Sequence, residues 1–263
     1  MSSPAITVSL PIFNAESFLA ECIQSILAQT FEDFEVIAVL DGCTDRSEEI
    51  LMDLKDHRFR VIKKERNEGQ VPACNQAIAE ARAPVVARMD ADDVMDVRRL
   101  ERQHDFLLEH TEVAVVGTYF DHIDQRGEQV RGAFPFPTTH EGIKEGFRVR
   151  VSVGHPTTAY RTAVVRSIGG YSPRFPVALD TGLWLRLLAE GHRFANIPEV
   201  LHHYREHGGQ VTHRLRREQL QAMNRAYRDY GPLIWGDDAP DVEFGAPLWR
   251  RAVRRVRRVL RPK

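Results

Sequence analysis

Residues 84–96, PVVARMDADDVMD, place an apolar run directly before four aspartates, Asp90, Asp92, Asp93 and Asp96. Two carboxylates about 4 Å apart repel each other by roughly 4 kcal/mol at an effective dielectric constant of about 20. A bound cation would offset this repulsion, and hard oxygen ligands on a short loop suit Mg²⁺ or Mn²⁺ that carries substrate phosphates. A solvated acidic loop is the alternative interpretation. The surrounding sequence has to indicate whether this loop lies where ligands bind.

Strand-like and helix-like segments alternate through the first part of the chain. A buried strand is expected at 5–12, and further strands are expected at 34–40, 59–64 and 84–89. Helical spacing of apolar residues predicts helices at 15–29, 46–56 and 70–81. This alternation is typical of an α/β fold with a mostly parallel sheet flanked by helices. Such sheets bind ligands at the carboxyl ends of their strands, so we expect the loops 11–14, 41–45 and 90–93 to open on one edge.

After Asp93 the alternation weakens, which suggests a second half that extends the same sheet. Its expected helices and strands are 97–109, 112–119, 179–191, 199–205 and 213–230. Asn14 is a candidate N-cap for the helix over 15–29, and Asp93 and Asp96 are expected to cap the helix over 97–109. The expected organisation is one domain over 1–231, divided at residue 93, and then a linker over 232–246.

The composition is that of an ordinary folded protein, with 43% hydrophobic and 28% charged residues. No apolar run approaches the roughly 18 residues needed to span a bilayer. The N-terminal MSSPAITVSL lacks the basic region and the apolar core of a signal peptide. Cys22, Cys43 and Cys74 show no C-x-x-C spacing, so neither a disulfide framework nor a zinc site is indicated. We therefore expect a cytoplasmic protein.

The C-terminal segment 247–263 differs in charge from the rest of the chain. It carries eight Arg and Lys residues and no acid, and because the net charge is −1, the preceding 246 residues carry −9. Its apolar residues fall on one helical stripe, made of Trp249, Ala252, Val253, Val256 and Leu260. A basic amphipathic helix of this kind is typical of peripheral attachment to an anionic membrane surface. A packing helix or a disordered tail is the alternative, and the acidic body argues against nucleic acid as a partner.

Several other phosphate-handling motifs are absent. The phosphatase pattern D-x-D-G-T would need an aspartate at Val39 in VLDGCTD. The loop LPIFNAES after the first strand is not the Gly- and Arg-rich loop of a sugar-nucleotide pyrophosphorylase. A Walker loop and a G-x-G-x-x-G turn are also missing, which excludes the P-loop and dinucleotide-binding interpretations.

Three segments, taken in order, resemble the family 2 glycosyltransferases of the GT-A fold. They are ITVSLPIFNAESFLAECIQSILAQTFEDFEVIAVLDGCTD (6–45), RNEGQVPACNQAIAEARAPVVARMDADD (66–93) and LDTGLWLRLLAEG (179–191). The resemblance implies a Rossmann-like nucleotide-sugar-binding half over 1–93 fused to an acceptor-binding half over 94–231. It also implies the inverting transfer of a single sugar from a nucleotide-diphosphate sugar to a hydroxyl acceptor in polysaccharide or glycan biosynthesis. A UDP-sugar is the expected donor.

The resemblance assigns the donor site to the loops at the carboxyl edge. Residues expected to meet the nucleotide base are Pro11, Phe13, Asn14 and Asp41. Arg66 and Asn67 are expected to border the nucleotide. The D-x-D motif consists of Asp90, which would contact the ribose or its water shell, Ala91, and Asp92, which would bind Mn²⁺ or Mg²⁺. A core aromatic is the alternative for Phe13, and a solvated turn is the alternative for 66–67.

The resemblance also assigns the general base and the remaining contacts. Asp180 in LDTGLWLR takes the place of the base, which must reach the acceptor hydroxyl on the face opposite the leaving diphosphate. A helix N-cap is the alternative role of Asp180, and both roles are compatible. In YREH, His207 is expected to complete the metal shell and Arg205 to meet the diphosphate. His155 in GHPTTAYR is expected near the acceptor.

Departures from the family pattern define two further expectations. Leu40 and Leu179 stand where family members commonly have acids, which motivates the alternative of a catalytically inactive nucleotide-sugar-binding protein. Gln210 is not followed by the Arg-Trp pair of the Q-x-x-R-W motif found in processive synthases. This difference favours single-sugar transfer. A glycan or a lipid-linked molecule is the expected acceptor, and attachment of 247–263 to the inner face of the cell membrane is the accompanying hypothesis.

Overall fold

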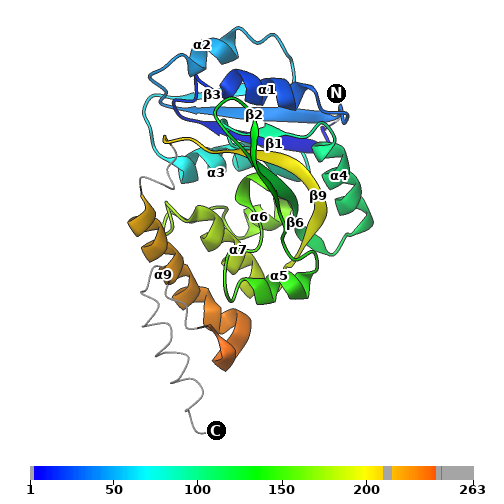
Figure 1. Ribbon diagram of the computed structural model, residues 1–263, viewed down its shortest axis with the longest axis vertical. Helices are drawn as coiled ribbons and strands as arrows, with labels where there is room; N and C mark the ends of the chain where they lie inside the picture. Colours follow the sequence, from blue (N-terminus) through cyan, green and yellow to red (C-terminus); the bar gives the residue numbers. More distant parts are fainter. Residues whose placement is uncertain (1–2, 210–214, 241–243, 245–263) are drawn as a thin grey trace.

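The computed structural model describes residues 3–209, 215–240 and 244. Within these residues the strands form one nine-stranded mixed sheet in the order β3-β2-β1-β4-β8-β6-β9-β5, and β7 pairs with β6 (Figure 1). The strands are β1 (Ile6–Ile12), β2 (Phe34–Asp41), β3 (Phe59–Lys64), β4 (Val85–Arg88), β5 (Val94–Met95), β6 (Val113–Ile123), β7 (Gln129–Phe134), β8 (Ala159–Arg161) and β9 (Arg193–Arg205). The α-helices are α1 (Leu19–Leu27), α2 (Ser47–Met52), α3 (Gln70–Glu80), α4 (Arg99–Glu109), α5 (His140–Gly146), α6 (Thr162–Ser167), α7 (Leu179–Ala189) and α9 (Arg216–Trp235). Two 3₁₀ helices, η1 (His155–Thr157) and η2 (Gly236–Asp238), complete the set.

The first four strands form the parallel part of the sheet. β1 pairs in parallel with both β2 and β4, so Ile6 lies opposite Phe34 on one side and Val85 on the other. β3 adds to β2 in the same direction. Because parallel strands point the same way, the loops that follow β1, β2 and β4 leave the sheet at one edge. The loops that follow β1, β2 and β4 therefore share one edge of the sheet, as predicted.

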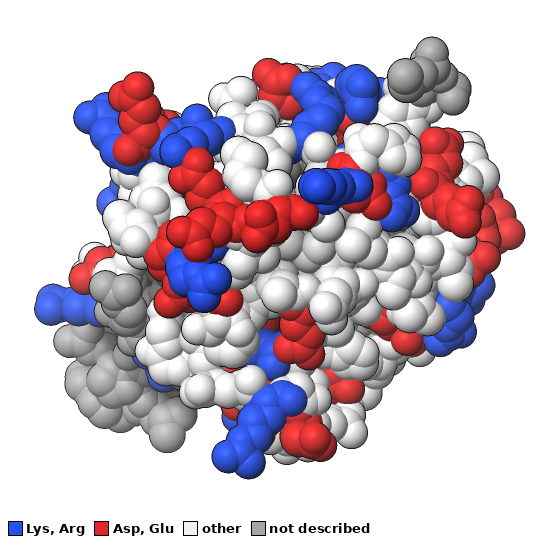
Figure 2. Space-filling model, turned by 90° about the horizontal axis from the view of Figure 1, so that it is seen from above, with Lys and Arg blue, Asp and Glu red and all other residues white. Residues whose placement is uncertain are grey.

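Charged side chains of both signs lie on the face that carries α1 and α2. Figure 2 views the molecule from the top of Figure 1, and a band of acidic residues crosses this face beside scattered Lys and Arg. α2 contributes two ion pairs, between Lys63 and Glu48 at 2.6 Å and between Arg46 and Glu49 at 3.0 Å. The described part of this face has no broad positive surface of the kind that nucleic-acid backbones bind.

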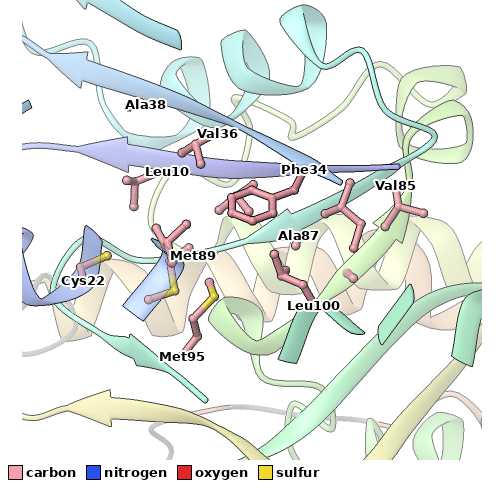
Figure 3. Close-up of a cluster of buried hydrophobic side chains, with 14 of the residues drawn as sticks. Leu10, Cys22, Phe34, Val36, Ala38, Val85, Ala87, Met89, Met95 and Leu100 are labelled. Atoms are coloured by element: carbon pink, nitrogen blue, oxygen red, sulfur yellow. The ribbon is translucent and has the colours of Figure 1, made fainter. Parts of the chain in front are cut away.

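The core lies on both faces of the parallel strands. On one face Leu10 and Val36 pack with Cys22 of α1 and Leu100 of α4 (Figure 3). On the other face Ile37 and its neighbours pack against α3. All positions of β2 are buried as a result, and this explains why its central residues 36–40 form a continuous apolar run instead of an alternating one, with the buried acids Glu35 and Asp41 on either side.

The second half extends the sheet with longer strands. β8 runs antiparallel between β4 and β6, and β6 and β9 pair in parallel over most of their length. β6 and β9 both extend beyond the predicted strands at 112–119 and 199–205. α7 is largely buried under these strands (Figure 1). Its residue Trp184 is fully buried in a second apolar cluster, which α7 forms with side chains of α3, α5 and α9. This cluster fixes the position of the N-terminus of α7.

α9 is longer than the sequence predicts. It continues to Trp235, whose ring stacks on that of Tyr227 with an interplanar angle of 8°. The predicted domain boundary at residue 231 therefore falls inside a packed helix, because the apolar side chains of Ile234 and Trp235 are buried against the second cluster. Of the predicted linker, 241–243 and 245–246 lie outside the described residues, as does the predicted basic helix 247–263. No helix within the described ranges has the length and apolar character needed to cross a membrane.

Candidate active site

Phe13 and Asn14 form the loop that follows β1, and Pro11 lies within the strand itself. Phe13 is 49% exposed, so its alternative role as a core aromatic is wrong and its ring is open to a planar ligand. Asn14 has φ +49°, and its Oδ1 accepts a 2.8 Å hydrogen bond from the N–H of Thr44. Asn14 therefore ties this loop to the turn after β2. It does not cap α1, whose N-cap position is Phe18.

The loop before α3 packs on the turn after β2. Asp41 accepts hydrogen bonds from the backbone N–H groups of 68–69, at 3.1 and 2.8 Å. A Cβ atom at Gly42, which has φ +67°, would lie 2.3 Å from backbone atoms of both Arg66 and Asn67, so glycine is required for this approach. Asp41 is only 3% exposed, whereas Arg66 and Asn67 are exposed. The structure thus places Asp41 as an anchor of the loop beneath the predicted nucleotide site.

Asp90 lies at the centre of this edge, directly after β4. The buried guanidinium of Arg88 donates to Asp90 Oδ1, and Gln70 Nε2 at the start of α3 lies 3.4 Å from the same oxygen. Burial raises the pKa of the Asp90 carboxyl, Arg88 lowers it and the charge of Asp92 raises it. No motif in the sequence pointed to Arg88 or Gln70. An arginine inside a buried strand was an available signal, because a buried cation needs a counter-charge.

Asp92 and His207 meet although 115 positions separate them in the chain. His207 Nε2 lies 2.9 Å from Asp92 Oδ2, and both side chains are partly exposed. Two ligands that bind Mg²⁺ or Mn²⁺ at about 2.1 Å and at right angles are about 3 Å apart, so this pair fits two adjacent positions of an octahedral shell. Among the described residues no group of three or more His, Cys, Asp and Glu could hold a metal ion. Water and a substrate diphosphate would have to supply the other ligands.

Ala91, between the two aspartates, is buried in the core cluster that contains Leu10, Val36 and Leu100. The packing of its side chain therefore holds the loop that carries the two aspartates.

Arg205 is fully buried against α1 and closed to a ligand. Its Nε donates to the carbonyl of Asp92 at 2.8 Å, its Nη1 to the carbonyl of Asp124 at 2.9 Å, and its Nη2 to Glu21 Oε2 at 2.6 Å. Its guanidinium also lies 5.0 Å from the ring centre of Phe18. This placement corrects the predicted contact with the diphosphate, because a ligand would have to displace these acceptors. Arg205 instead braces the loop that carries Asp92.

Asp93 belongs to a buried hydrogen-bonded chain. Its Oδ2 lies 2.8 Å from His202 Nε2, and its Oδ1 accepts from the N–H of Arg205 at 2.8 Å. Arg99 Nη1 lies 3.0 Å from His202 Nδ1, and because a guanidinium only donates, His202 carries its proton on Nε2 and donates it to Asp93. The prediction that Asp93 caps a helix is therefore wrong. Asp96 does accept from a backbone N–H directly before α4.

Asp180 occupies the first turn of α7. Thr181 Oγ1 lies 3.4 Å from Asp180 Oδ1, and Leu179 beside it is buried in the second cluster. Burial raises the pKa of Asp180, the hydrogen bonds from Thr181 lower it, and the charge of Asp90 raises it. The role of Asp180 as general base stays a prediction.

His155 starts η1 and is almost fully buried. Its Nε2 lies 2.8 Å from the hydroxyl of Tyr171, and its ring centre lies 6.1 Å from that of Trp184. Burial and the charge of Arg88 lower its pKa well below the ordinary value, so the imidazole is neutral. His155 thus forms part of the wall between α7 and the sheet. A contact with the acceptor stays a prediction.

The parallel half-sheet with its open carboxyl edge, joined to a mixed second half, is the architecture of a GT-A glycosyltransferase. Residues 7–169 match the family described as Glycosyl transferase family 2. The chain belongs to this family and is a glycosyltransferase. The predicted family and the predicted α/β fold are confirmed.

Named relatives agree with this assignment. The chain is 34% identical to the "Putative glycosyltransferase EpsE" of Bacillus subtilis over 211 residues, which cover 78% of this chain and 74% of that protein. It is 31% identical to the "O-antigen biosynthesis glycosyltransferase WbnJ" of Escherichia coli over 208 residues, which cover 77% and 80%. Both matches extend over most of each chain.

Solved structures share the fold at low sequence identity. S. aureus TarS 1-349 in complex with UDP-GlcNAc aligns with a TM-score of 0.73 and 19% identity, over 88% of this chain and 70% of that chain. The mannosyltransferase PcManGT from Pyrobaculum calidifontis, in complex with GDP-Man and Mn²⁺, aligns with a TM-score of 0.62 and 17% identity, over 87% and 64%. These similarities establish the GT-A fold.

Proposed function

We propose that the protein is an inverting glycosyltransferase that moves one sugar from a UDP-sugar to a hydroxyl of a glycan acceptor. The observation that carries this proposal is the meeting of the Asp92 carboxylate and the His207 imidazole at the carboxyl edge of the sheet. The UDP-GlcNAc in TarS supports a UDP-sugar donor, and the role of WbnJ in O-antigen biosynthesis supports an acceptor in polysaccharide assembly.

The donor lies on the loops of the first half in this proposal. The exposed ring of Phe13 stacks on the base, and Asn14 holds that loop against the turn after β2. Arg66 and Asn67 border the nucleotide from the loop that Asp41 anchors. Asp90, whose charge is balanced by Arg88, receives the ribose or its water shell.

Asp92 and His207 would hold the divalent cation. Mn²⁺ or Mg²⁺ bound there would neutralise the negative charge that develops on the leaving diphosphate. Mn²⁺ in PcManGT supports this choice of ion. Arg205 keeps the backbone of Asp92 in place, so that its carboxylate faces His207.

Asp180 acts as the general base. Its carboxylate takes the proton of the attacking hydroxyl while that oxygen bonds to the anomeric carbon and the bond from this carbon to the diphosphate oxygen breaks. Attack and departure occur on opposite faces, so the configuration inverts. The raised pKa of Asp180 supports the role, because a base works best when its pKa approaches the working pH.

Calorimetric titration of UDP, GDP, dTDP and CMP, first with Mn²⁺ and then with a chelator, tests the donor and the cation. We expect UDP to bind in a metal-dependent manner, and Asp92→Ala to remove the metal-dependent part. Asp96→Ala is the matched control, because that carboxylate belongs to the same acidic cluster but accepts from a backbone N–H at α4. If no nucleotide binds under either condition, the proposal fails.

A measurement of donor turnover in an Asp180 variant tests whether Asp180 is the general base. Asp180→Asn should abolish sugar transfer and leave UDP binding intact, because the amide keeps the shape of the side chain but cannot accept the proton. The alternative of an inactive binding protein predicts no turnover by the unaltered enzyme. Turnover that survives in Asp180→Asn would remove Asp180 from the mechanism.

The charge of 247–263 supports a further part of the proposal, which is attachment to an anionic membrane that presents a lipid-linked acceptor. This segment lies outside the described residues, and the argument rests on its eight positive charges and its apolar stripe. Co-sedimentation with liposomes that contain anionic lipid should depend on 247–263. Equal co-sedimentation of a chain without this segment would contradict the idea.

A further inference from the structure

Arg99, the first residue of α4, holds the acidic loop that carries Asp92 from both of its ends. Its Nη2 donates to the carbonyl of Arg88, at the end of β4, at 2.6 Å. Its Nη1 lies 3.0 Å from His202 Nδ1, and His202 Nε2 lies 2.8 Å from Asp93 Oδ2. One guanidinium therefore reaches the loop twice, once directly and once through the ring of His202.

The three side chains of this chain are closed to solvent. Arg99 and His202 are 0% exposed, and Asp93 is 1% exposed. A buried charge without a counter-charge is costly, so Arg99 and Asp93 stabilise each other inside the protein. The ring of His202 joins them, because it accepts from Arg99 and donates to Asp93. Burial and the charge of Arg99 lower the pKa of His202 well below its ordinary value, so the ring is neutral.

The guanidinium of Arg99 is itself fixed by α4. Its Nε donates to Gln103 Oε1 at 3.2 Å, one turn further along the helix. Gln103 is also buried, and its Nε2 donates to the carbonyl of Thr157 at 2.8 Å. Each of the three guanidinium nitrogens of Arg99 thus has a hydrogen-bond partner. A group held in this way is a rigid support for the loop.

Asp93 converts this support into a restraint on Asp92. Its Oδ2 is bonded by His202, and its Oδ1 accepts from the N–H of Arg205 at 2.8 Å. Both oxygens of Asp93 are therefore engaged inside the protein. Because Asp92 and Asp93 are consecutive, a shift of Asp93 would move the backbone of Asp92. The 2.9 Å distance from Asp92 Oδ2 to His207 Nε2 would change with it.

We propose that Arg99 and His202 are positioning residues for Asp92. They act through Asp93 and keep the Asp92 carboxylate in the place from which it would bind the divalent cation. The inference rests on the proposed function, in which Asp92 is a metal ligand, and adds two buried residues that touch neither the cation nor the donor. Hydrogen-bonding residues that orient metal ligands in this way commonly change metal affinity by about 10- to 100-fold when they are altered.

Calorimetric titration of UDP, with Mn²⁺ and then with a chelator, tests the role of His202 in two variants. His202→Met removes both hydrogen bonds. We expect it to lower the metal-dependent part of the UDP affinity by about 10- to 100-fold and to leave UDP binding in chelator unchanged. His202→Gln keeps an acceptor for Arg99 and a donor for Asp93 in one uncharged side chain, so it should keep most of the metal-dependent affinity.

His203→Met is the matched control. His203 is the next residue of β9, and its Nδ1 lies 2.7 Å from Asp121 Oδ1. This variant therefore also removes a hydrogen bond between a histidine and an aspartate, but Asp121 belongs to β6 and not to the acidic loop. UDP should bind to His203→Met as it binds to the unaltered enzyme, with and without Mn²⁺.

Arg99→Lys provides a second test, which carries the proposal if His202→Met does not fold. A lysine keeps the charge but cannot donate in three fixed directions from a planar group. We expect the same selective loss of metal-dependent affinity. Thermal unfolding of each variant shows whether the fold is retained.

Four results would overturn the inference. They are an unchanged metal-dependent affinity in His202→Met, equal losses with and without Mn²⁺, the same loss in His203→Met, and a loss in His202→Gln as large as that in His202→Met. A failure of the proposed function looks different, because the unaltered enzyme itself would then show no metal-dependent binding of UDP.

Discussion

Arg205 Nε donates a 2.8 Å hydrogen bond to the carbonyl of Asp92, and the backbone N–H of Arg205 donates to the side chain of Asp93, also at 2.8 Å. One residue near the end of β9 therefore holds two consecutive residues of the acidic loop. The ring of Phe18 packs against both the Arg205 guanidinium and His207. The relative position of Asp92 and His207 thus depends on Arg205.

Arg205→Lys should weaken metal-dependent UDP binding by about 10- to 100-fold, the range typical of residues that orient metal ligands. A lysine keeps the charge but cannot donate in three directions from a planar group. Calorimetry with Mn²⁺ and with chelator measures the metal-dependent and the metal-independent parts of the UDP affinity. UDP binding in chelator should not change. Arg102→Lys, at a partly exposed ion pair with Glu199, is the control. Equal losses with and without metal would mean that Arg205 acts on the fold as a whole.

Phe13→Ala should lower the affinity for UDP by about 1–3 kcal/mol, as expected when a ring that stacks on a base is removed. Stability should change little, because the Phe13 side chain is half exposed. Calorimetry and thermal unfolding measure the two quantities. Leu108→Ala removes an exposed apolar side chain of α4 and should affect neither. Unchanged UDP affinity in Phe13→Ala would remove this ring from the donor site.

The pH dependence of turnover should report the raised pKa of Asp180. A base must be deprotonated, so the rate falls as pH falls through its pKa, and burial moves this fall above the pH of an ordinary aspartate. Thr181→Val removes a hydroxyl that lowers the pKa, so the acid limb of the kcat profile should move to still higher pH. An acid limb that stays in place in Thr181→Val would assign it to another group.

Glu35 should stabilise the fold in a pH-dependent way. It is buried, and although burial raises its pKa, hydrogen bonds from Arg82 and Thr7 lower it below the ordinary value. A lowered pKa means that the stabilisation is present above the unfolded-state pKa of about 4.3 and is lost as pH falls through the folded-state pKa. Glu35→Gln should therefore lower the free energy of unfolding at neutral pH by about 1–3 kcal/mol.

Denaturant unfolding at several pH values measures the effect of Glu35→Gln, and the difference from the unaltered protein should shrink in acid. Glu49→Gln is the control, because the ion pair of Glu49 with Arg46 is highly exposed. Exposed pairs contribute about 1 kcal/mol or less. A difference that is constant with pH would show that the Glu35 charge does not carry the effect.

The first half of the fold follows from local sequence. Apolar runs of strand length, helical spacing and turns such as DGCTD recur at short intervals, and right-handed crossovers leave few topologies for such a chain. The edge that carries Asp90 and Asp92 could be predicted for the same reason. The cap predicted at Asp93 was wrong, and α9 continues past residue 231, because the local pattern does not show which side chains the tertiary structure buries.

The sequence by itself determined the α/β class, the parallel strands and the edge on which the acidic loop lies, because these depend on periodicity and on turns between neighbouring segments. Only the tertiary structure decided what each charged side chain does there. The pairing of β9 with β5 and β6 brings His207 to Asp92 and buries Arg205 behind them. Such contacts join residues more than a hundred positions apart, and burial then decides which groups face a ligand and which hold the site together.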